Sequence, residues 1–107
     1  MQLLLHNKKC IVTGASQGLG RAIAILLAAE QCDLVLVARR KKPLEEVKKF
    51  IQKKYNCNVV TLSIDVTSKN ADIKIKDFAL KQLGTIDVLI NSSVDSRQRR
   101  TTGWRRP

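Results

Sequence analysis

Residues 9–24 read Lys-Cys-Ile-Val-Thr-Gly-Ala-Ser-Gln-Gly-Leu-Gly-Arg-Ala-Ile-Ala, and this stretch decides the fold. Cys10–Thr13 is a short apolar run that suits a strand buried between two layers. The turn after it contains Gly14, Gly18 and Gly20, which have no Cβ, so its backbone can bend sharply and approach a ligand closely. A helix that follows would direct its unpaired N–H groups and the positive end of its dipole into this turn. The stretch therefore predicts a strand, a phosphate-binding turn and a helix.

The composition of the 107-residue chain fits a single domain with an aliphatic core. Hydrophobic residues make up 44% of the chain and aromatic residues only 4%, so the core depends on aliphatic side chains. No apolar run approaches the ~20 residues of a membrane span, and Leu3-Leu4-Leu5 is too short for a signal-peptide core. We therefore expect a cytoplasmic protein that makes no membrane contact.

The cysteines and the histidine indicate neither a disulfide framework nor a metal centre. Cys10, Cys32 and Cys57 are odd in number and form no Cys-x-x-Cys pair, which is typical of reduced thiols in the cytosol. We interpret each cysteine as a small apolar packing residue. His6 has no cysteine or acid at ligand spacing, so we expect it on the surface and expect no metal site.

The chain up to Asn91 alternates between strand and helix patterns. The expected strands are apolar or β-branched runs, and the expected helices carry apolar residues at helical spacing. The strands are 10–13, 34–37, 59–64 and 87–90, and the helices are 18–30, 43–55 and 71–83. This alternation predicts an α/β fold of three α-β-α layers, with right-handed crossovers and a partial parallel sheet of four strands in the order 3-2-1-4.

The three expected helices differ in the surfaces that they bury. Residues 22–29 are apolar almost all round, so we expect the first helix to be buried on most sides. Pro43 suits the first turn of the second helix. The expected apolar face of that helix consists of Leu44, Val47, Phe50, Ile51 and Tyr55, and Lys48, Lys49, Lys53 and Lys54 form a solvated opposite face. In the third helix, Ile75, Phe78, Ala79 and Gln82 share one face.

Four motifs in order resemble the short-chain dehydrogenase/reductase family over about residues 8–91. The first is Thr-Gly-x-x-x-Gly-x-Gly at residues 13–20, which has the spacing of that family's cofactor turn. The resemblance implies a Rossmann-like domain in which Ser16 and the turn backbone hold the phosphates of a dinucleotide. The cofactor-binding residues that it implies here are Gly14, Ser16, Gln17, Gly18, Leu19 and Gly20. The alternative is a glycine-rich turn with no ligand.

The second motif, Ala38-Arg39-Arg40, follows the expected strand 34–37. Family members that prefer NAD usually carry an acid where Ala38 stands, to accept the ribose hydroxyls. Arg39 could instead hold the 2′-phosphate of NADP through charge-assisted hydrogen bonds of ~1.5–3 kcal/mol. The resemblance therefore implies NADP(H) as the cofactor, held mainly by Arg39, with Arg40 beside it.

The third and fourth motifs extend the implied site to the other strand ends. Asp65-Val66 resembles the family's adenine contact, since a carboxylate can accept from the adenine amino group; the alternative is a helix-capping aspartate. The strand that ends at Asn91 resembles the one leading into the family's Asn-Asn-Ala-Gly segment, which makes Asn91 a cofactor-binding residue. Here Ser92 follows, and Val94 replaces a glycine where the cofactor ribose needs close backbone approach.

The family's catalytic residues are missing from this sequence. Family members transfer hydride to or from a carbonyl or alcohol with a serine and a Tyr-x-x-x-Lys motif, in the second half of a longer chain. Tyr55 is the single tyrosine here, and Val59, not lysine, stands four residues later. We therefore assign no catalytic residue and expect an inactive front half of an NADP-dependent oxidoreductase. A truncated isoform, a fragment and a coding region with an out-of-frame tail all fit this pattern.

The net charge of +11 and the expected sheet edge keep two other functions open. We expect residues 1–95 to form a partial NADP-binding domain and residues 96–107, with five arginines and no acid, to form a disordered tail. The open edge at strand 87–90 could pair with a full-length reductase, as a homo- or hetero-oligomer. The tail, with Trp104 for base stacking, could bind nucleic acid, although a solvated tail is the simpler interpretation.

Overall fold

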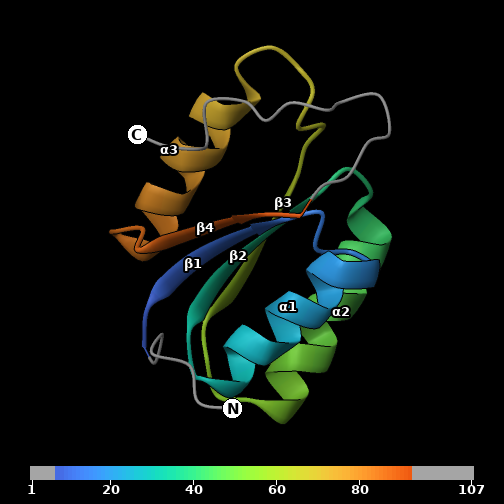
Figure 1. Cartoon of the computed structure of the whole chain (residues 1–107), viewed down its shortest axis with the longest axis vertical. Coiled ribbons are helices and arrows are strands. Elements are labelled where there is room, and N and C mark those ends of the chain that lie inside the picture. Colours follow the sequence, from blue (N-terminus) through green and yellow to red (C-terminus); the bar gives the residue numbers. More distant parts are fainter. Residues whose placement is uncertain (1–6, 93–107) are drawn as a thin grey trace.

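Four aliphatic and β-branched runs form the parallel sheet that organises the molecule (Figure 1). The computed structural model describes residues 7–92. The strands are β1 (Lys9–Thr13), β2 (Asp33–Ala38), β3 (Val59–Ser63) and β4 (Val88–Asn91). They lie in the order β3-β2-β1-β4 and are all parallel, which confirms the predicted topology.

The three helices cover both faces of the sheet and are α1 (Gly18–Ala29), α2 (Lys41–Lys54) and α3 (Ala71–Leu83). Figure 1 shows α1 and α2 on one face and α3 on the other. The strand order explains why the helices lie on two faces, because β1 to β3 progress in one direction across the sheet and the chain then crosses back to β4. Right-handed crossovers in opposite directions place their helices on opposite faces, which gives the expected three layers.

The core consists of two clusters, one on each face of the sheet. Alternate strand residues point to opposite faces, so Leu34 and Leu36 face α1 and α2 while Val35 and Val37 face α3. All four are fully buried. Because helices cover both faces, the central strands need no polar side, which explains their unbroken apolar sequence.

The observed boundaries differ from the expected ones by one or two residues at several ends. The largest difference is at α2, which begins at Lys41 rather than Pro43 and ends at Lys54. Pro43 is the third residue of the helix and so still lies in the first turn, where a missing N–H costs nothing. β4 also begins and ends one residue later than expected, at Val88 and Asn91.

The expectation about burial of the first helix is wrong. The first helix is not buried on most sides, because Leu19 and Leu26 are 65% and 60% exposed and Ala22 and Ala29 are exposed as well. Only its sheet-facing side, with Ala24, Leu27 and Ala28, is fully packed. In α3, Ile75 and Ala79 are fully buried and Phe78 is half-buried, whereas Gln82 near the helix end is exposed.

Polar contacts join the amino ends of β1, β2 and β4, and two cysteine thiols are packed nearby. Lys9 Nζ lies 2.5 Å from Asp33 Oδ2, and the Lys9 amide donates to Asp87 Oδ2 at 2.8 Å. Cys10 and Cys32 are fully buried in the core, as expected of packing residues. Burial raises the pKa of the Cys10 thiol to about 12, so this thiol is a poor nucleophile.

Some features of the sequence analysis fall outside residues 7–92, namely His6 and the arginine-rich segment 96–107. In the part of the chain that the structure describes, no helix has the length and apolar character needed to cross a membrane. The same part contains no group of three or more histidine, cysteine or acidic side chains arranged to hold a metal ion.

Candidate functional site

The glycine turn lies at the carboxyl edge of the sheet, between β1 and the start of α1. Gly14 directly follows β1 and has φ +64°, in the left-handed region that favours glycine. The Ala15 amide then donates to Val37 O of β2 at 3.1 Å, which ties the turn to the neighbouring strand. The predicted strand, turn and helix are therefore present in the predicted order.

Gly20 allows α1 to approach the ends of β1 and β4 closely. A Cβ at this position would lie 2.0 Å from Gly14 O and 2.6 Å from Ser92 Oγ. No side chain larger than hydrogen fits there, because one of the atoms in the way belongs to the backbone. Gly18, by contrast, has open space where a Cβ would lie. Glycine is favoured there by its φ of +59°, which lies in the left-handed region, and not by a lack of room.

The N-terminus of α1 is open to a ligand. Gln17 occupies the N-cap position with extended backbone, and no side chain of residues 7–92 caps the helix there. The first turn of α1 carries no acid. Gln17, Gly18 and Leu19 are exposed, and Ser16 is half-buried. The orphan N–H groups and the helix dipole together suit an anion at this position.

A partly buried polar network links the carboxyl ends of β1 and β4. Thr13 is fully buried, and its hydroxyl donates to Asn91 Oδ1 at 2.9 Å. The Ser92 hydroxyl donates back to Thr13 O. The network holds Asn91 and Ser92 beside the glycine turn. Sequence reasoning included Asn91 but missed Thr13 and Ser92; the polar residue that closes an apolar strand was the available signal for Thr13.

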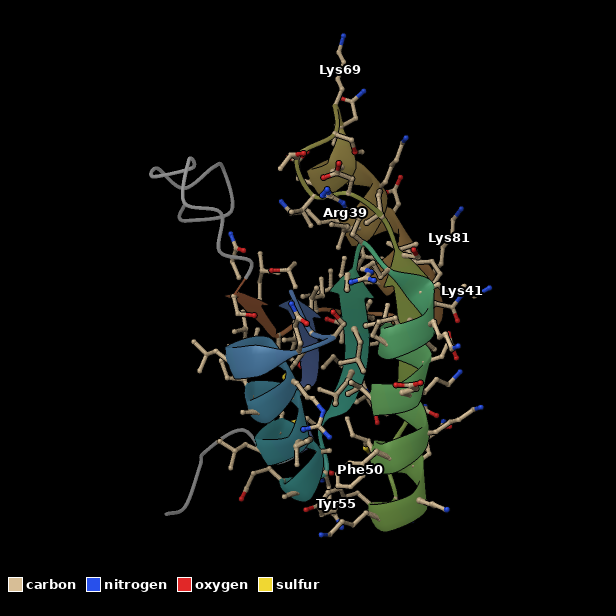
Figure 2. The ribbon with its side chains drawn as sticks, turned by 90° about the vertical axis from the view of Figure 1, so that its right-hand side faces the viewer. Arg39, Lys41, Phe50, Tyr55, Lys69 and Lys81 are labelled. Carbon is tan, nitrogen blue, oxygen red and sulfur yellow. The ribbon has the colours of Figure 1, made fainter. Side chains whose placement is uncertain are left out.

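Arg39 and Arg40 follow β2 at the same edge of the sheet, and both are exposed. The Ser63 hydroxyl of β3 donates to Arg39 O at 2.9 Å, which fixes the backbone at the start of this segment. Figure 2 shows Arg39 at the end of the sheet that faces the loop between β3 and α3. Arg40 is the N-cap residue of α2.

Asp65 lies in a tight turn between β3 and α3 rather than at a helix cap. Its Oδ1 accepts from the Thr67 amide at 2.9 Å and from the Thr67 hydroxyl at 2.6 Å. These bonds, assisted by the charge of Arg39, lower the pKa of Asp65, so the carboxylate is ionised at neutral pH. The N-cap of α3 is Asn70, which removes the alternative that Asp65 caps this helix. Val66 is half-buried against the α3 side of the core.

The structure does not bring Tyr55 to this edge. Tyr55 directly follows α2, and Figure 2 shows it at the opposite end of the molecule from Arg39. A phenol at that position cannot exchange a proton with a molecule bound at the glycine turn. Among residues 7–92, the edge thus combines a helix N-terminus without a side-chain cap, two exposed arginines and an ionised carboxylate, with no tyrosine.

A family model and several known proteins match the sequence of this chain. The model of the short chain dehydrogenase family matches residues 8–101. An uncharacterised oxidoreductase of Staphylococcus saprophyticus is 38% identical over 89 residues, covering 83% of this chain and 38% of that protein. An NADP-dependent 3-hydroxy acid dehydrogenase of Schizosaccharomyces pombe is 34% identical over 90 residues, covering 83% of this chain and 35% of that protein.

A solved structure agrees with these relatives. The L-sorbose reductase of Gluconobacter frateurii, crystallised with NADPH and L-sorbose, superposes with a TM-score of 0.81 at 28% identity. The superposition covers 85% of this chain and 35% of the reductase. The chain therefore spans little more than a third of the length of each of these three proteins.

Proposed function

Since the chain belongs to the short-chain dehydrogenase family, we propose that it binds NADP(H) at the carboxyl edge of its sheet. The pyrophosphate would lie against the N-terminus of α1, where the turn provides N–H groups and Ser16. The 2′-phosphate would lie against Arg39 and Arg40, and the adenine against Asp65 and Val66. Two relatives support this cofactor, one named NADP-dependent and one crystallised with NADPH.

The observation that carries the proposal is that Gly20 and Arg39 both lie at the carboxyl edge of the sheet. Gly20 permits the close approach of α1 to the ends of β1 and β4, which leaves backbone rather than side chains around the turn. Arg39 is an exposed guanidinium at the end of β2, the strand next to β1. Ala38 before it carries no charge, so nothing at that position repels a phosphate. Together they favour a dinucleotide that carries a 2′-phosphate, as NADP does, over NAD, which lacks it.

In this proposal the chain supplies cofactor binding and not the proton transfer of a reductase. When bound, NADPH would supply the hydride for a carbonyl substrate. No tyrosine-lysine pair stands in the sequence to exchange the proton, and Tyr55 lies far from the edge. Carbonyl or alcohol turnover would thus require residues that other family chains carry.

Fluorescence titration of the 107-residue chain with NADPH and NADH tests the cofactor. We expect saturable binding with a preference for NADPH. Arg39→Ala should weaken NADPH binding by about 10- to 150-fold, the equivalent of a lost charge-assisted interaction of ~1.5–3 kcal/mol, and leave NADH binding unchanged. Arg40→Ala should weaken NADPH binding less.

The matched control is Lys53→Ala, which removes one positive charge from the last turn of α2, away from the carboxyl edge. This variant should bind both cofactors as the unmodified chain does. Equal affinities for NADPH and NADH, or an equal loss in Arg39→Ala and Lys53→Ala, would contradict the proposed role of Arg39.

A further inference from the structure

We propose that the outward side of α2, together with Arg21 of α1, is a binding surface for single-stranded nucleic acid. This surface has basic side chains for the phosphates and an exposed aromatic ring for the bases. We call it the α2 basic surface, and it consists of Arg21, Lys42, Lys49, Phe50, Lys53 and Lys54. The inference does not depend on NADP(H) binding, because it uses none of the residues assigned to the cofactor.

The positive charge of the chain is concentrated in two segments. Residues 39–54 carry eight arginines and lysines and two glutamates, and residues 96–107 carry five arginines and no acid. The remaining residues contain seven basic and seven acidic side chains, so the whole net charge of +11 comes from these two segments. Most of the first segment is the helix α2. A charge concentrated on one element favours a polyanionic partner.

The way in which α2 packs decides where its lysines lie. The buried residues of the helix, which face the sheet, are Leu44, Val47 and Ile51. Lys42, Lys49 and Lys53 are seven and four positions apart, so they share one side of the helix, opposite the buried residues. All three are exposed. The side of α2 that faces away from the sheet is therefore lined with lysines.

The glutamates of α2 do not neutralise these lysines through ion pairs. Glu45 Oε2 accepts from the Thr61 hydroxyl of β3 at 2.5 Å, so it is directed toward the sheet edge. Glu46 is exposed on the outward side, but within residues 7–92 it forms no ion pair. The α2 basic surface therefore combines five basic groups with one neighbouring acid, Glu46, and has a local net charge of +4.

Phe50 adds an aromatic ring at the border of this surface. Its side chain is 40% exposed. The Arg21 guanidinium lies 5.6 Å from the ring centroid and Lys54 Nζ lies 5.8 Å from it. Figure 2 shows Phe50 on the side of α2 that faces α1. Aromatic rings and guanidinium groups both stack on nucleobases, and only unpaired bases have free faces, so this pair favours a single strand.

An anionic membrane fits this surface less well than a nucleic acid does. Helices that bind a membrane surface bury their apolar side among the lipids. The apolar side of α2 is already buried on the sheet. The outward side, with Lys42, Glu46, Lys49 and Lys53, contains no apolar residue that could enter the bilayer. These lysines instead suit a flexible chain of phosphates that runs along the helix.

Fluorescence anisotropy with a labelled oligothymidylate of about 15 nucleotides tests the inference. Titration with the 107-residue chain at several salt concentrations gives the slope of log K against log salt concentration, which reports the number of phosphate contacts. The double variant Lys49→Ala/Lys53→Ala should reduce this slope by about 1.4, since each contact with a single strand contributes ~0.7. Every variant keeps residues 96–107, so any contribution of those arginines cancels.

Phe50→Leu separates base stacking from charge. The substitution keeps an apolar side chain and removes the ring, so the affinity for oligothymidylate should fall by about 5- to 150-fold while the salt slope stays the same. Binding of a DNA duplex of equal length should not respond to Phe50→Leu, because its bases are already stacked.

The matched control is Lys74→Ala/Lys81→Ala, which removes two positive charges from α3, on the other face of the sheet. It should leave the salt slope unchanged. An equal change of slope in the two double variants, no change in Lys49→Ala/Lys53→Ala, or no binding by the unmodified chain would overturn the inference. Binding to phosphatidylserine vesicles but not to oligothymidylate would overturn it as well. NADPH titration of Lys49→Ala/Lys53→Ala tests the proposed function separately.

Discussion

Glycines in the turn serve different physical purposes, although the sequence shows only their spacing. Gly14 and Gly18 have positive φ angles, so glycine is favoured there by backbone conformation. Gly20 lies within the helix, and its missing side chain leaves room for Gly14 O and Ser92 Oγ. At the residue scale, Gly20 is therefore the position at which the packing of α1 against two strand ends is decided.

Gly20→Ala should destabilise the chain far more than Gly18→Ala. The added methyl group of Gly20→Ala meets backbone that cannot move aside, so we expect a loss at or above the ~3 kcal/mol upper end of ordinary overpacking. Gly18→Ala should cost only the ~1–2 kcal/mol of a left-handed residue with a side chain. Urea unfolding curves of both variants measure the difference, and equal stabilities would contradict the packing argument.

At the scale of the elements, α1 and the β3–α3 turn show what packing adds to pattern. α1 has the composition of a helix buried on most sides, yet only one side contacts the sheet, and Leu19 and Leu26 remain exposed. Asp65 has the sequence context of a helix cap, yet its carboxylate closes a turn with Thr67, and the N-cap position of α3 is Asn70, five residues later. For α1 the packing against the sheet decides the environment, whereas for Asp65 a local turn with Thr67 decides it.

The stability of the β3–α3 turn should depend on pH through Asp65. Its pKa is lowered in the folded chain, so its contribution is complete above the ordinary aspartate value of about 4 and is lost as pH falls through the lower folded value. Asp65→Asn should flatten the pH dependence of the unfolding free energy in that acidic window.

Asp77→Asn is the control for this acidic window, because Asp77 is an exposed residue on α3. Urea unfolding between pH 2 and pH 6 compares the three proteins. A pH profile that Asp65→Asn leaves unchanged would exclude this carboxylate as the source.

At the scale of the whole molecule, the proposed cofactor edge and the open sheet edge at β4 lie on the same half of the sheet. The polar network of Thr13, Asn91 and Ser92 joins β1 to β4 at the cofactor edge. The apolar residues of β4 continue from there along the strand.

The chain alone should bind NADPH without oxidising it in the presence of carbonyl compounds. No tyrosine-lysine pair is available to exchange a proton at the carboxyl edge, so the NADPH absorbance should stay constant with a panel of ketones and aldehydes. The G. frateurii L-sorbose reductase with L-sorbose serves as the active control. Carbonyl-dependent oxidation that disappears in Arg39→Ala would show that this chain has a proton donor of its own.

Local pattern alone determined the order of strands and helices, the parallel sheet and the position of the glycine turn. Each of these depends on the apolar periodicity of residues near in sequence, such as 10–13 and 34–37, and on right-handed crossovers. Periodicity could not determine which side of α1 is covered or what Thr13 and Asp65 contact. The covered side of α1 and the contact of Thr13 depend on atoms distant in the chain, since Thr13 meets Asn91 only when β4 pairs with β1. The contact of Asp65 is local, because its partner Thr67 is two residues away, but it follows from turn geometry and not from periodicity.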